Sequence, residues 1–242
     1  MPILYIVATP IGNLKDITHR ALEVLHGVDV ILCEDTRVTH KLLSHYGIKK
    51  PLESYHQHSR LAKADHILEM LAEGKNIALI SDAGTPGISD PGGMLVEAVR
   101  ERFYDAVKIV PIPGANAALA ALSVSGFPAD RFLFLGFPPH KKGRKTYFEK
   151  IAATEETIVF YESKHRIIKA LEELSRIAPA RPVMVARELT KQFETLYHGT
   201  ILLQRQNFLR PRRASPAHGG TPSWRGLRDV PGRGRESSKL GA

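Results

Sequence analysis

The sequence predicts an α/β fold built around a mostly parallel sheet, and three observations lead to this prediction. Strand-like and helix-like segments alternate over about the first 200 residues. The strand-like segments are continuous apolar runs such as Ile3–Ala8, without the polar–apolar alternation of a half-exposed sheet. Several of these runs end in loops rich in Gly and Pro. Strands that alternate with helices and are buried on both faces are typical of parallel sheets.

The first half of the chain supplies most of this pattern. The first helix is expected to begin near Asp16 or Thr18, either of which can cap it, and to carry Leu22 and Leu25 on one face. Apolar spacing predicts two further helices, at residues 61–71 and 94–103. Apolar runs predict strands at residues 3–8, 28–33, 76–80 and 107–112.

The second half continues the alternation with a different composition. Residues 115–124 predict a helix of small apolar residues, and Ile167 and Leu174 belong to a second helical face. Residues 138–145 are interpreted as an exposed basic loop. Strands are predicted at residues 132–137, 157–161, 182–186 and 195–198. We expect a domain boundary near Pro113 and Gly114, with domains at residues 1–114 and 115–203.

The charge is unevenly distributed. The net charge is +9, but residues 201–242 hold nine of the 34 basic residues and two of the 25 acidic ones. A nucleic-acid surface must therefore be argued from local clusters in the nearly neutral body. No apolar run approaches the roughly 18 residues of a membrane helix, and no secretory signal is visible. A single cysteine, Cys33, excludes a disulfide framework. We expect a cytoplasmic protein.

Three loops that follow apolar strands are rich in turn-forming residues: Ala8–Leu14, Ser81–Gly93 and Pro111–Ala117. Loops at the carboxyl ends of parallel strands meet at one edge of the sheet, where ligands bind. Gly lets backbone groups approach a ligand closely, although Gly and Pro also serve simply to make turns. Neither the Walker A nor the G-x-G-x-x-G pattern is present, so no phosphate cradle is indicated.

Six segments of the sequence are distinctive enough to compare with known families: Val7–Leu14, Cys33–Arg37, Ser81–Gly92, Pro113–Ala117, Phe160–Ser163 and Ala186–Lys191. Together they resemble the tetrapyrrole-methylase superfamily over about residues 1–200. Within it, the resemblance is strongest to enzymes that methylate a cytidine ribose 2′-hydroxyl in small-subunit (16S) ribosomal RNA. The resemblance implies two α/β domains with S-adenosylmethionine in the cleft between them, commonly as a homodimer.

The resemblance also implies which residues contact the cofactor. Backbone groups and small side chains suit a zwitterionic nucleoside, and the Asp82 carboxylate is suited to its amino group. The cofactor positions implied are Pro10, Ser81, Asp82, Ala83, Gly84, Thr85, Ala115, Asn116, Tyr161 and Ala186.

Catalysis would consist mainly of aligning a ribose hydroxyl with the methyl group, helped by a base. Lys191, Glu188 and Asp35 are the candidates for that base. The first two are equally well interpreted as solvated charges at a strand end, and Asp35 as a helix cap. The basic residues expected to contact RNA phosphates are Arg37, Lys141, Lys142, Arg144, Lys145 and Arg166, although a solvated loop remains the alternative. No metal is expected, because His56 and His58 lack a carboxylate at ligand spacing.

The C-terminal segment departs from the family pattern, which continues past position 200 with a helix and a final apolar strand. Residues 204–242 are instead rich in Arg, Gly, Pro and Ser, as in an out-of-frame reading of GC-rich DNA, and we expect them to be disordered. The second domain would then lack a strand and be weakened. Two alternatives to RNA methylation therefore remain open: methylation of a corrin or porphyrin precursor, and an inactive truncated product whose basic tail binds nucleic acid nonspecifically.

Overall fold

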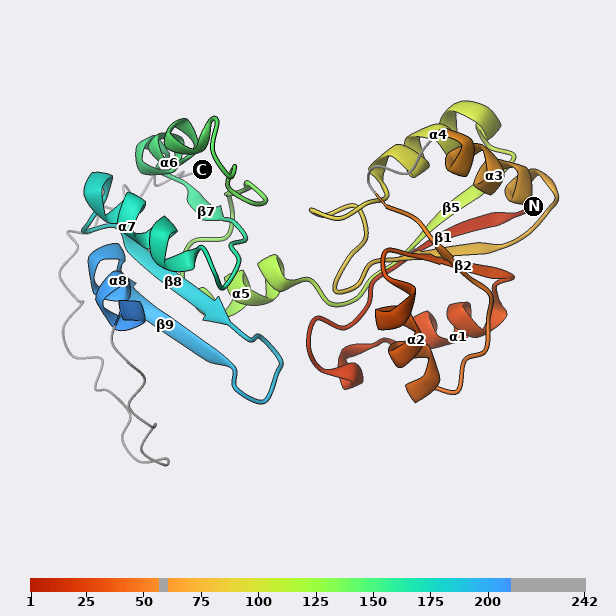
Figure 1. Cartoon of the computed structure of the whole chain (residues 1–242), viewed down its shortest axis with the longest axis horizontal. Helices are drawn as coiled ribbons and strands as arrows, with labels where there is room; N and C mark the ends of the chain where they lie inside the picture. The colour runs from red at the N-terminus through yellow and green to blue at the C-terminus, as the bar shows by residue number, and fades with distance from the viewer. Residues whose placement is uncertain (57–60, 210–242) are drawn as a thin grey trace, which may run out of the picture. The chain divides into compact units, whose positions relative to one another are not determined.

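The computed structural model describes residues 1–56 and 61–209 (Figure 1). The chain divides into two units, Met1–Leu209 and Arg210–Ala242, and only the first is described below. No helix in residues 1–56 and 61–209 is both long and apolar enough to cross a membrane.

A five-stranded parallel sheet forms from the first half of the chain, in the order β3-β2-β4-β1-β5. Its central strands are buried because each apolar run packs on both faces. The sequence predicts four of the five strands, and β3 is the one it misses. The strands are β1 (Ile3–Val7), β2 (Val30–Cys33), β3 (Leu52–Ser54), β4 (Ile77–Ile80) and β5 (Lys108–Ile112).

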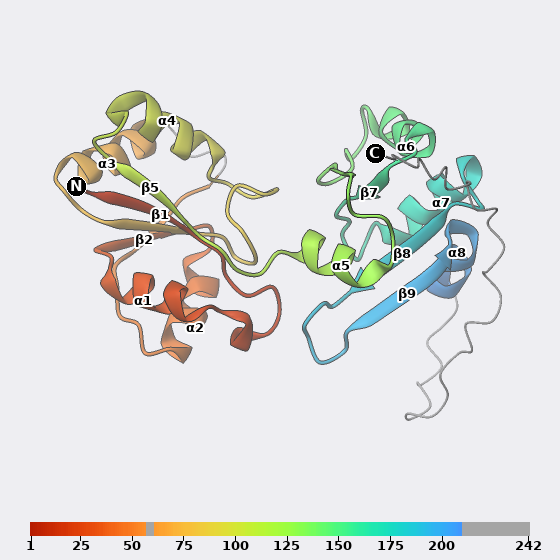
Figure 2. The same cartoon turned by 180° about the vertical axis from the view of Figure 1, so that it is seen from behind.

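Helices cover both faces of this sheet (Figures 1 and 2). Leu25 and Leu43 belong to the apolar core on one face, and Leu71 and Leu95 to the core on the other. Thr18, rather than Asp16, caps the first helix, because its side chain accepts a hydrogen bond from the Ala21 N–H. The helices are α1 (His19–Gly27) and α2 (Thr36–His45) on one face, and α3 (Leu61–Ala72) and α4 (Gly93–Phe103) on the other.

The second half of the described chain forms two separate two-stranded sheets. β6 (Phe132–Phe134) pairs in parallel with β7 (Thr157–Val159), and β8 (Pro182–Arg187) pairs antiparallel with β9 (Thr195–Thr200). All four strands were predicted, but β6 and β7 are shorter than expected. Four helices accompany them: α5 (Ala117–Ser125), α6 (Arg144–Ala153), α7 (Ile167–Ile177) and α8 (Ile201–Leu209).

The prediction that the chain is disordered from residue 204 onward is wrong for residues 204–209. Residues 201–209 form α8, whose Ile201 and Gln204 are buried. The Phe208 ring lies 4.8 Å from that of Tyr197 on β9. Tertiary packing thus stabilises a segment that has no helical periodicity. The rest of the predicted disordered tail, residues 210–242, lies outside the described residues.

Candidate functional site

The three loops that the sequence singles out meet at the carboxyl edge of the five-stranded sheet. Thr9 and Gly84 form an antiparallel bridge, with N···O distances of 2.8 and 3.0 Å. The Thr85 hydroxyl donates to the Ala115 carbonyl at 3.2 Å. The loops after β1, β4 and β5 therefore support one another, as expected for the carboxyl ends of neighbouring parallel strands.

Gly84 lies at the centre of this arrangement in a conformation that disfavours other residues. Its φ is +90°, and an added Cβ would lie 3.4 Å from Ile11 Cγ2 and 3.7 Å from the Ala115 oxygen. The Ser81 hydroxyl donates to the Gly84 carbonyl at 3.2 Å, and the Ser81 carbonyl accepts from the Thr9 hydroxyl at 3.0 Å. Ser81 is buried, so its polar groups shape the loop.

Three carboxylates lie near one another at this edge. Burial raises the pKa of Glu34 to about 7, and the charges of Asp90 and Asp82 add to the rise. Burial and Asp82 likewise raise the pKa of Asp90. Asp82 itself is exposed, and one of its oxygens accepts the Asp35 N–H at 3.1 Å. The edge is therefore acidic, and a cationic ligand group would be favoured there.

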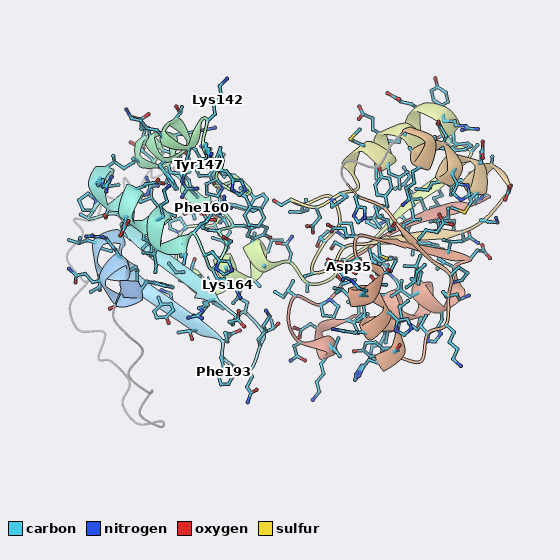
Figure 3. All side chains as sticks on the ribbon, in the orientation of Figure 1. Asp35, Lys142, Tyr147, Phe160, Lys164 and Phe193 are labelled. Atoms are coloured by element: carbon cyan, nitrogen blue, oxygen red, sulfur yellow. The ribbon has the colours of Figure 1, made fainter. Side chains whose placement is uncertain are left out.

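Asp35 acts as the N-cap of α2. Its side chain accepts the Arg37 N–H at 2.8 Å and pairs with the Arg37 guanidinium at 2.6 Å. These hydrogen bonds from Arg37 hold the pKa of Asp35 well below its usual range. Asp35 stands at the start of α2 in Figure 3. The capping alternative is confirmed, and an acid held so firmly ionised is a poor proton acceptor.

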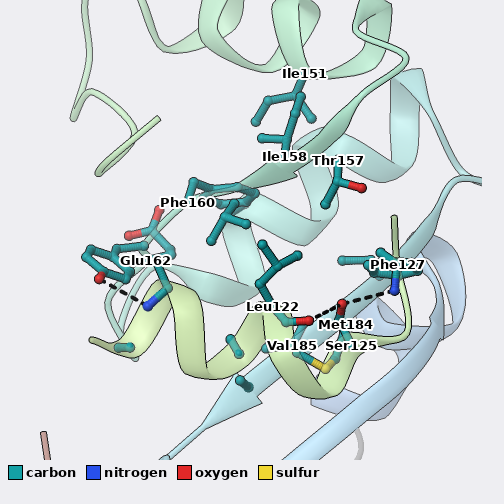
Figure 4. Close-up of a pocket in the computed structure, with 18 of the residues that line it drawn as sticks. Leu122, Ser125, Phe127, Ile151, Thr157, Ile158, Phe160, Glu162, Met184 and Val185 are labelled. Carbon is teal, nitrogen blue, oxygen red and sulfur yellow. Dashed lines mark hydrogen bonds between the residues drawn. The ribbon is translucent and has the colours of Figure 1, made fainter. Parts of the chain in front are cut away.

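A cavity of about 1570 Å³ is lined in part by residues of the loop after β4. Figure 4 shows the part of this cavity around Leu122, Ile158 and Val185. Pockets for small ligands occupy about 300–1,000 Å³, so the volume exceeds what one nucleoside cofactor needs. Six of the ten implied cofactor residues line it, mostly with small side chains and backbone groups, which fits S-adenosylmethionine. They are Ala83, Gly84, Thr85, Asn116, Tyr161 and Ala186.

The other four implied residues do not line the cavity. Pro10 and Ser81 are buried within their loops, and the Ala115 carbonyl is engaged by Thr85. Asp82 is exposed beside the carboxylates described above. The structure therefore places these four residues in the loops beside the cavity and not in its wall.

Two residues implied from the second domain lie at strand ends. Tyr161 follows β7, and its hydroxyl accepts the Ala118 N–H at 3.3 Å at the first turn of α5. Its ring packs edge-on against Phe134, with centroids 5.0 Å apart. Ala186 lies near the end of β8. Asn116 caps α5 by accepting the Leu119 N–H.

The loop between β8 and β9 carries the two remaining candidates for a base. Glu188 lines the cavity and has a φ of +54°, which is unusual for a residue with a side chain. Lys191 Nζ lies 3.7 Å from Glu188 Oε2, and both side chains are nearly half exposed. Thr190 is also in the left-handed region, with a φ of +63°. This strained loop brings a carboxylate and an ammonium to the cavity rim.

Arg144 is not the exposed RNA contact that the sequence predicts. Only 7% of its side chain is exposed, because it begins α6 and points inward. Its Nε lies 2.7 Å from Glu173, its Nη1 lies 3.4 Å from Glu162, and its guanidinium stacks 4.8 Å from the Phe148 centroid. The surrounding run of basic residues gave no sign of this burial, because the two partner carboxylates come later in the chain.

The other basic candidates divide into two groups. Arg166 is largely buried, with its Nε 2.8 Å from Glu162, whereas Arg37 is exposed and paired with Asp35. Lys141 and Lys142 are exposed in the loop before α6, and Figure 3 shows Lys142 extending outward. Lys145 is exposed and lies 3.6 Å from Glu149. The lysines remain available to an anionic partner.

Sequence reasoning missed residues that hold this half of the chain together. Glu162 has 2% of its side chain exposed and joins Arg144 to Arg166. Arg181 donates to the carbonyls of Ile151 and Thr154, each at 2.7 Å. Glu162 lies within the Phe160–Ser163 segment of the family resemblance, but that segment by itself does not predict the ion pairs that Glu162 makes.

Within residues 1–56 and 61–209, no three His, Cys, Asp or Glu side chains are grouped to hold a metal ion. Of the two histidines considered in the sequence, His58 lies outside the described residues. Cys33 is buried, as predicted, and burial raises the pKa of its thiol.

Comparisons with known proteins identify the family of this chain. Residues 3–202 match the family of tetrapyrrole (corrin/porphyrin) methylases. A protein of Haemophilus influenzae named "Ribosomal RNA small subunit methyltransferase I" is 54% identical over 201 residues, which are 82% of this chain and 70% of that protein. The Escherichia coli O157:H7 protein of the same name is 52% identical, and the match covers 80% of this chain and 68% of that protein. The Bacillus subtilis protein of the same name is 48% identical, and the match covers 83% of this chain and 68% of that protein.

Solved structures share the fold at lower identity. The methyltransferase CobJ superposes with a TM-score of 0.63 at 22% identity, covering 84% of this chain and 87% of that one. Diphthine synthase superposes with a TM-score of 0.65 at 16% identity, covering 87% of each. With the family match over most of its length, the chain belongs to the tetrapyrrole methylases and is an S-adenosylmethionine-dependent methyltransferase.

Proposed function

We propose that this chain methylates small-subunit ribosomal RNA, and specifically a cytidine ribose 2′-hydroxyl. The observation that carries the proposal is the identity of about half of all residues with proteins named for this RNA substrate, over more than 80% of the chain. The solved structures of CobJ and diphthine synthase are at most 22% identical to this chain and support the fold alone. RNA is therefore favoured over a corrin or porphyrin precursor.

The chain's residues have three tasks in this reaction. The Ala83–Thr85 loop and Tyr161 hold the cofactor, which supplies a methyl group already activated on a sulfonium. Glu188, at the cavity rim, accepts the proton from the ribose hydroxyl, and the Lys191 ammonium lies 3.7 Å from that carboxylate. Lys141 and Lys142 bind RNA phosphates, which align the nucleotide with the cavity.

Transfer of labelled methyl groups tests the proposal directly. The full chain is incubated with labelled S-adenosylmethionine and one of two acceptors, small ribosomal subunits from cells lacking this activity or a precorrin extract. We expect label in the RNA, and in a nuclease-resistant 2′-O-methyl dinucleotide. Label in the corrin fraction alone, or base methylation, would contradict the proposal. RNA binding without any transfer would favour the inactive-product alternative.

The lysine contacts have a separate test. Replacing Lys141 and Lys142 by Gln should flatten the log–log salt dependence of RNA binding by about 1.4 units, at roughly 0.7 for each single-strand phosphate contact. The matched control replaces Lys49 and Lys108, two exposed lysines on other elements, and changes the net charge equally. Equal slopes for the two variants would show that the loop contacts solvent only.

A further inference from the structure

One large aromatic ring is exposed in the loop that carries the candidate base. Phe193 is 72% exposed, and Figure 3 shows it at the tip of the loop between β8 and β9. Its ring contacts no other ring in the described part of the chain, whereas the exposed Phe137 packs 5.4 Å from Tyr161. A single exposed apolar residue is common on protein surfaces, so the surroundings of the ring must show whether it is a site.

Hydrogen bonds within the loop hold Phe193 in place. The Thr190 N–H donates to Glu194 Oε2 at 2.6 Å, and the Glu194 N–H donates to the Lys191 carbonyl at 3.1 Å. The Thr195 hydroxyl donates to the Phe193 carbonyl at 3.2 Å. A ring on a loop of fixed conformation is pre-organised, so less conformational entropy is lost when a ligand binds to it.

The same loop packs closely on the loop after β1. A Cβ added at Gly12 would lie 2.7 Å from the Leu189 carbonyl oxygen and 2.9 Å from Thr190 Oγ1. Only Gly permits the backbones to approach this closely. The contact supports the loop between β8 and β9 from outside, in addition to its own hydrogen bonds.

The residues around Phe193 suit a nucleotide. Glu188 and Arg187 line the cavity, and the side chain of Lys191 is 47% exposed. Arg187 makes no ion pair within residues 1–56 and 61–209. The loop therefore combines an exposed ring with two cations. Proteins bind unpaired nucleotides with this combination, in which the ring stacks on a base and the cations contact phosphate.

We propose that Phe193 is a stacking surface for one unpaired RNA base, next to the nucleotide whose ribose reaches Glu188. This inference rests on the proposed RNA methylation and adds a base-binding residue to it. Turning a nucleotide out of an RNA stack loses base stacking, and the phenyl ring replaces part of what is lost. The ring has no hydrogen-bonding group, so it holds the face of a base without selecting among the four bases.

Fluorescence of a Phe193→Trp variant of the full chain tests stacking without requiring methyl transfer. The wild-type chain has one Trp, Trp224, so the difference between variant and wild-type emission reports on position 193. The probes are an oligocytidylate of about ten nucleotides and an abasic oligomer of the same length, which carries the same phosphates. We expect oligocytidylate to quench the difference emission by about half and the abasic oligomer to leave it unchanged. No quenching, or equal quenching by both oligomers, would overturn the proposal.

Tyr104→Trp is the matched control. Tyr104 is 82% exposed and lies between the end of α4 and the start of β5, so it is at the edge of the parallel sheet opposite the loops of the site. This variant should show no quenching beyond that of the wild-type chain. Quenching at position 104 as strong as that at position 193 would mean that RNA binds the surface nonspecifically, and would also count against the proposal.

Phe193→Leu separates stacking from simple apolar contact, because Leu is apolar but has no flat face. Its affinity for small-subunit RNA should fall at least about fivefold, whereas Phe193→Trp should stay within about twofold of the wild-type chain. Calorimetry should give unchanged affinity for S-adenosylmethionine in both, because Phe193 does not line the cavity.

The outcomes separate this inference from the proposed function. Quenching at position 193 without methyl transfer to RNA by the wild-type chain would contradict the proposed function and support the stacking surface. Methyl transfer with full RNA affinity in Phe193→Leu would support the proposed function and refute the stacking surface. Loss of self-association in Phe193→Leu at unchanged RNA affinity would assign the ring to an interface between two copies of the chain, and would refute it as well.

Discussion

The two halves of the described chain differ in how their strands are paired. In residues 3–112, five parallel strands pair continuously, and apolar side chains fill both faces. In residues 132–209, four strands form two separate pairs around a smaller apolar cluster. In this second half, charged side chains connect segments that backbone hydrogen bonds connect in the first half. Arg144 pairs with both Glu162 and Glu173, and Arg181 donates hydrogen bonds to backbone carbonyls. One buried and one half-buried arginine thus join segments of this half that no backbone ladder connects.

The largest difference between the halves should appear in their apolar cores. Leu32 is fully buried in β2, between β3 and β4, so Leu32→Ala should lower the free energy of unfolding by about 2–5 kcal/mol. Ile158 is only half-buried in β7, and Ile158→Ala should cost about 1–2 kcal/mol. Urea unfolding followed by circular dichroism measures both. Equal losses would mean that the second half is as tightly packed as the first.

The buried ion network gives the next largest effect. Arg144→Met keeps much of the side-chain volume but leaves Glu162 and Glu173 without one cation, so stability should fall by about 3 kcal/mol. Lys145→Met, one residue along the same helix, removes an exposed charge and should change stability by less than about 0.5 kcal/mol.

The same pair of variants distinguishes stability from RNA binding. The cofactor affinity of the folded fraction should be unchanged in both, because neither side chain lines the cavity. If Arg144→Met instead weakened RNA binding without loss of stability, Arg144 would be a contact residue after all.

The smallest effect concerns the acidic edge of the first half and depends on pH. The pKa of Glu34 is raised from 4.5 to about 7, so the folded state holds the proton more tightly than the unfolded state. The stability due to protonated Glu34 is fully present below pH 4.5 and is lost as the pH rises through 7. Glu34→Gln should therefore raise the melting temperature by about 2–4 °C at pH 8 and by little near pH 5.

An exposed acid on α1 provides the control for this pH effect. Glu23→Gln removes the same charge from an exposed position and should leave the melting temperature unchanged at both pH values. A Glu34→Gln variant with the same shift at pH 5 and pH 8 would mean that burial does not perturb the titration of Glu34.

Most of the helices and strands, and the family, can be predicted from the amino-acid sequence alone. The apolar runs predict every strand of both halves except β3, because a strand buried on both faces needs an unbroken apolar segment. The Gly- and Pro-rich loops marked the edge at which Thr9, Gly84 and Ala115 meet. Short or polar elements were missed: β3 has only three residues, α2 buries only two apolar side chains, Leu42 and Leu43, and α6 has no clear apolar face.

The contacts of individual charged side chains depend on the tertiary structure. Arg144 and Lys142 are indistinguishable in a basic run, yet Arg144 is buried and Lys142 is exposed. The difference arises because the carboxylates that pair with Arg144 come from the loop after β7 and from α7, later in the chain. Likewise, α8 has no periodicity and is held in place by packing, including that of Phe208 on Tyr197. Pairing between strands is also a long-range property, so the sequence showed that β7 and β8 exist, and the fold alone revealed the space between them.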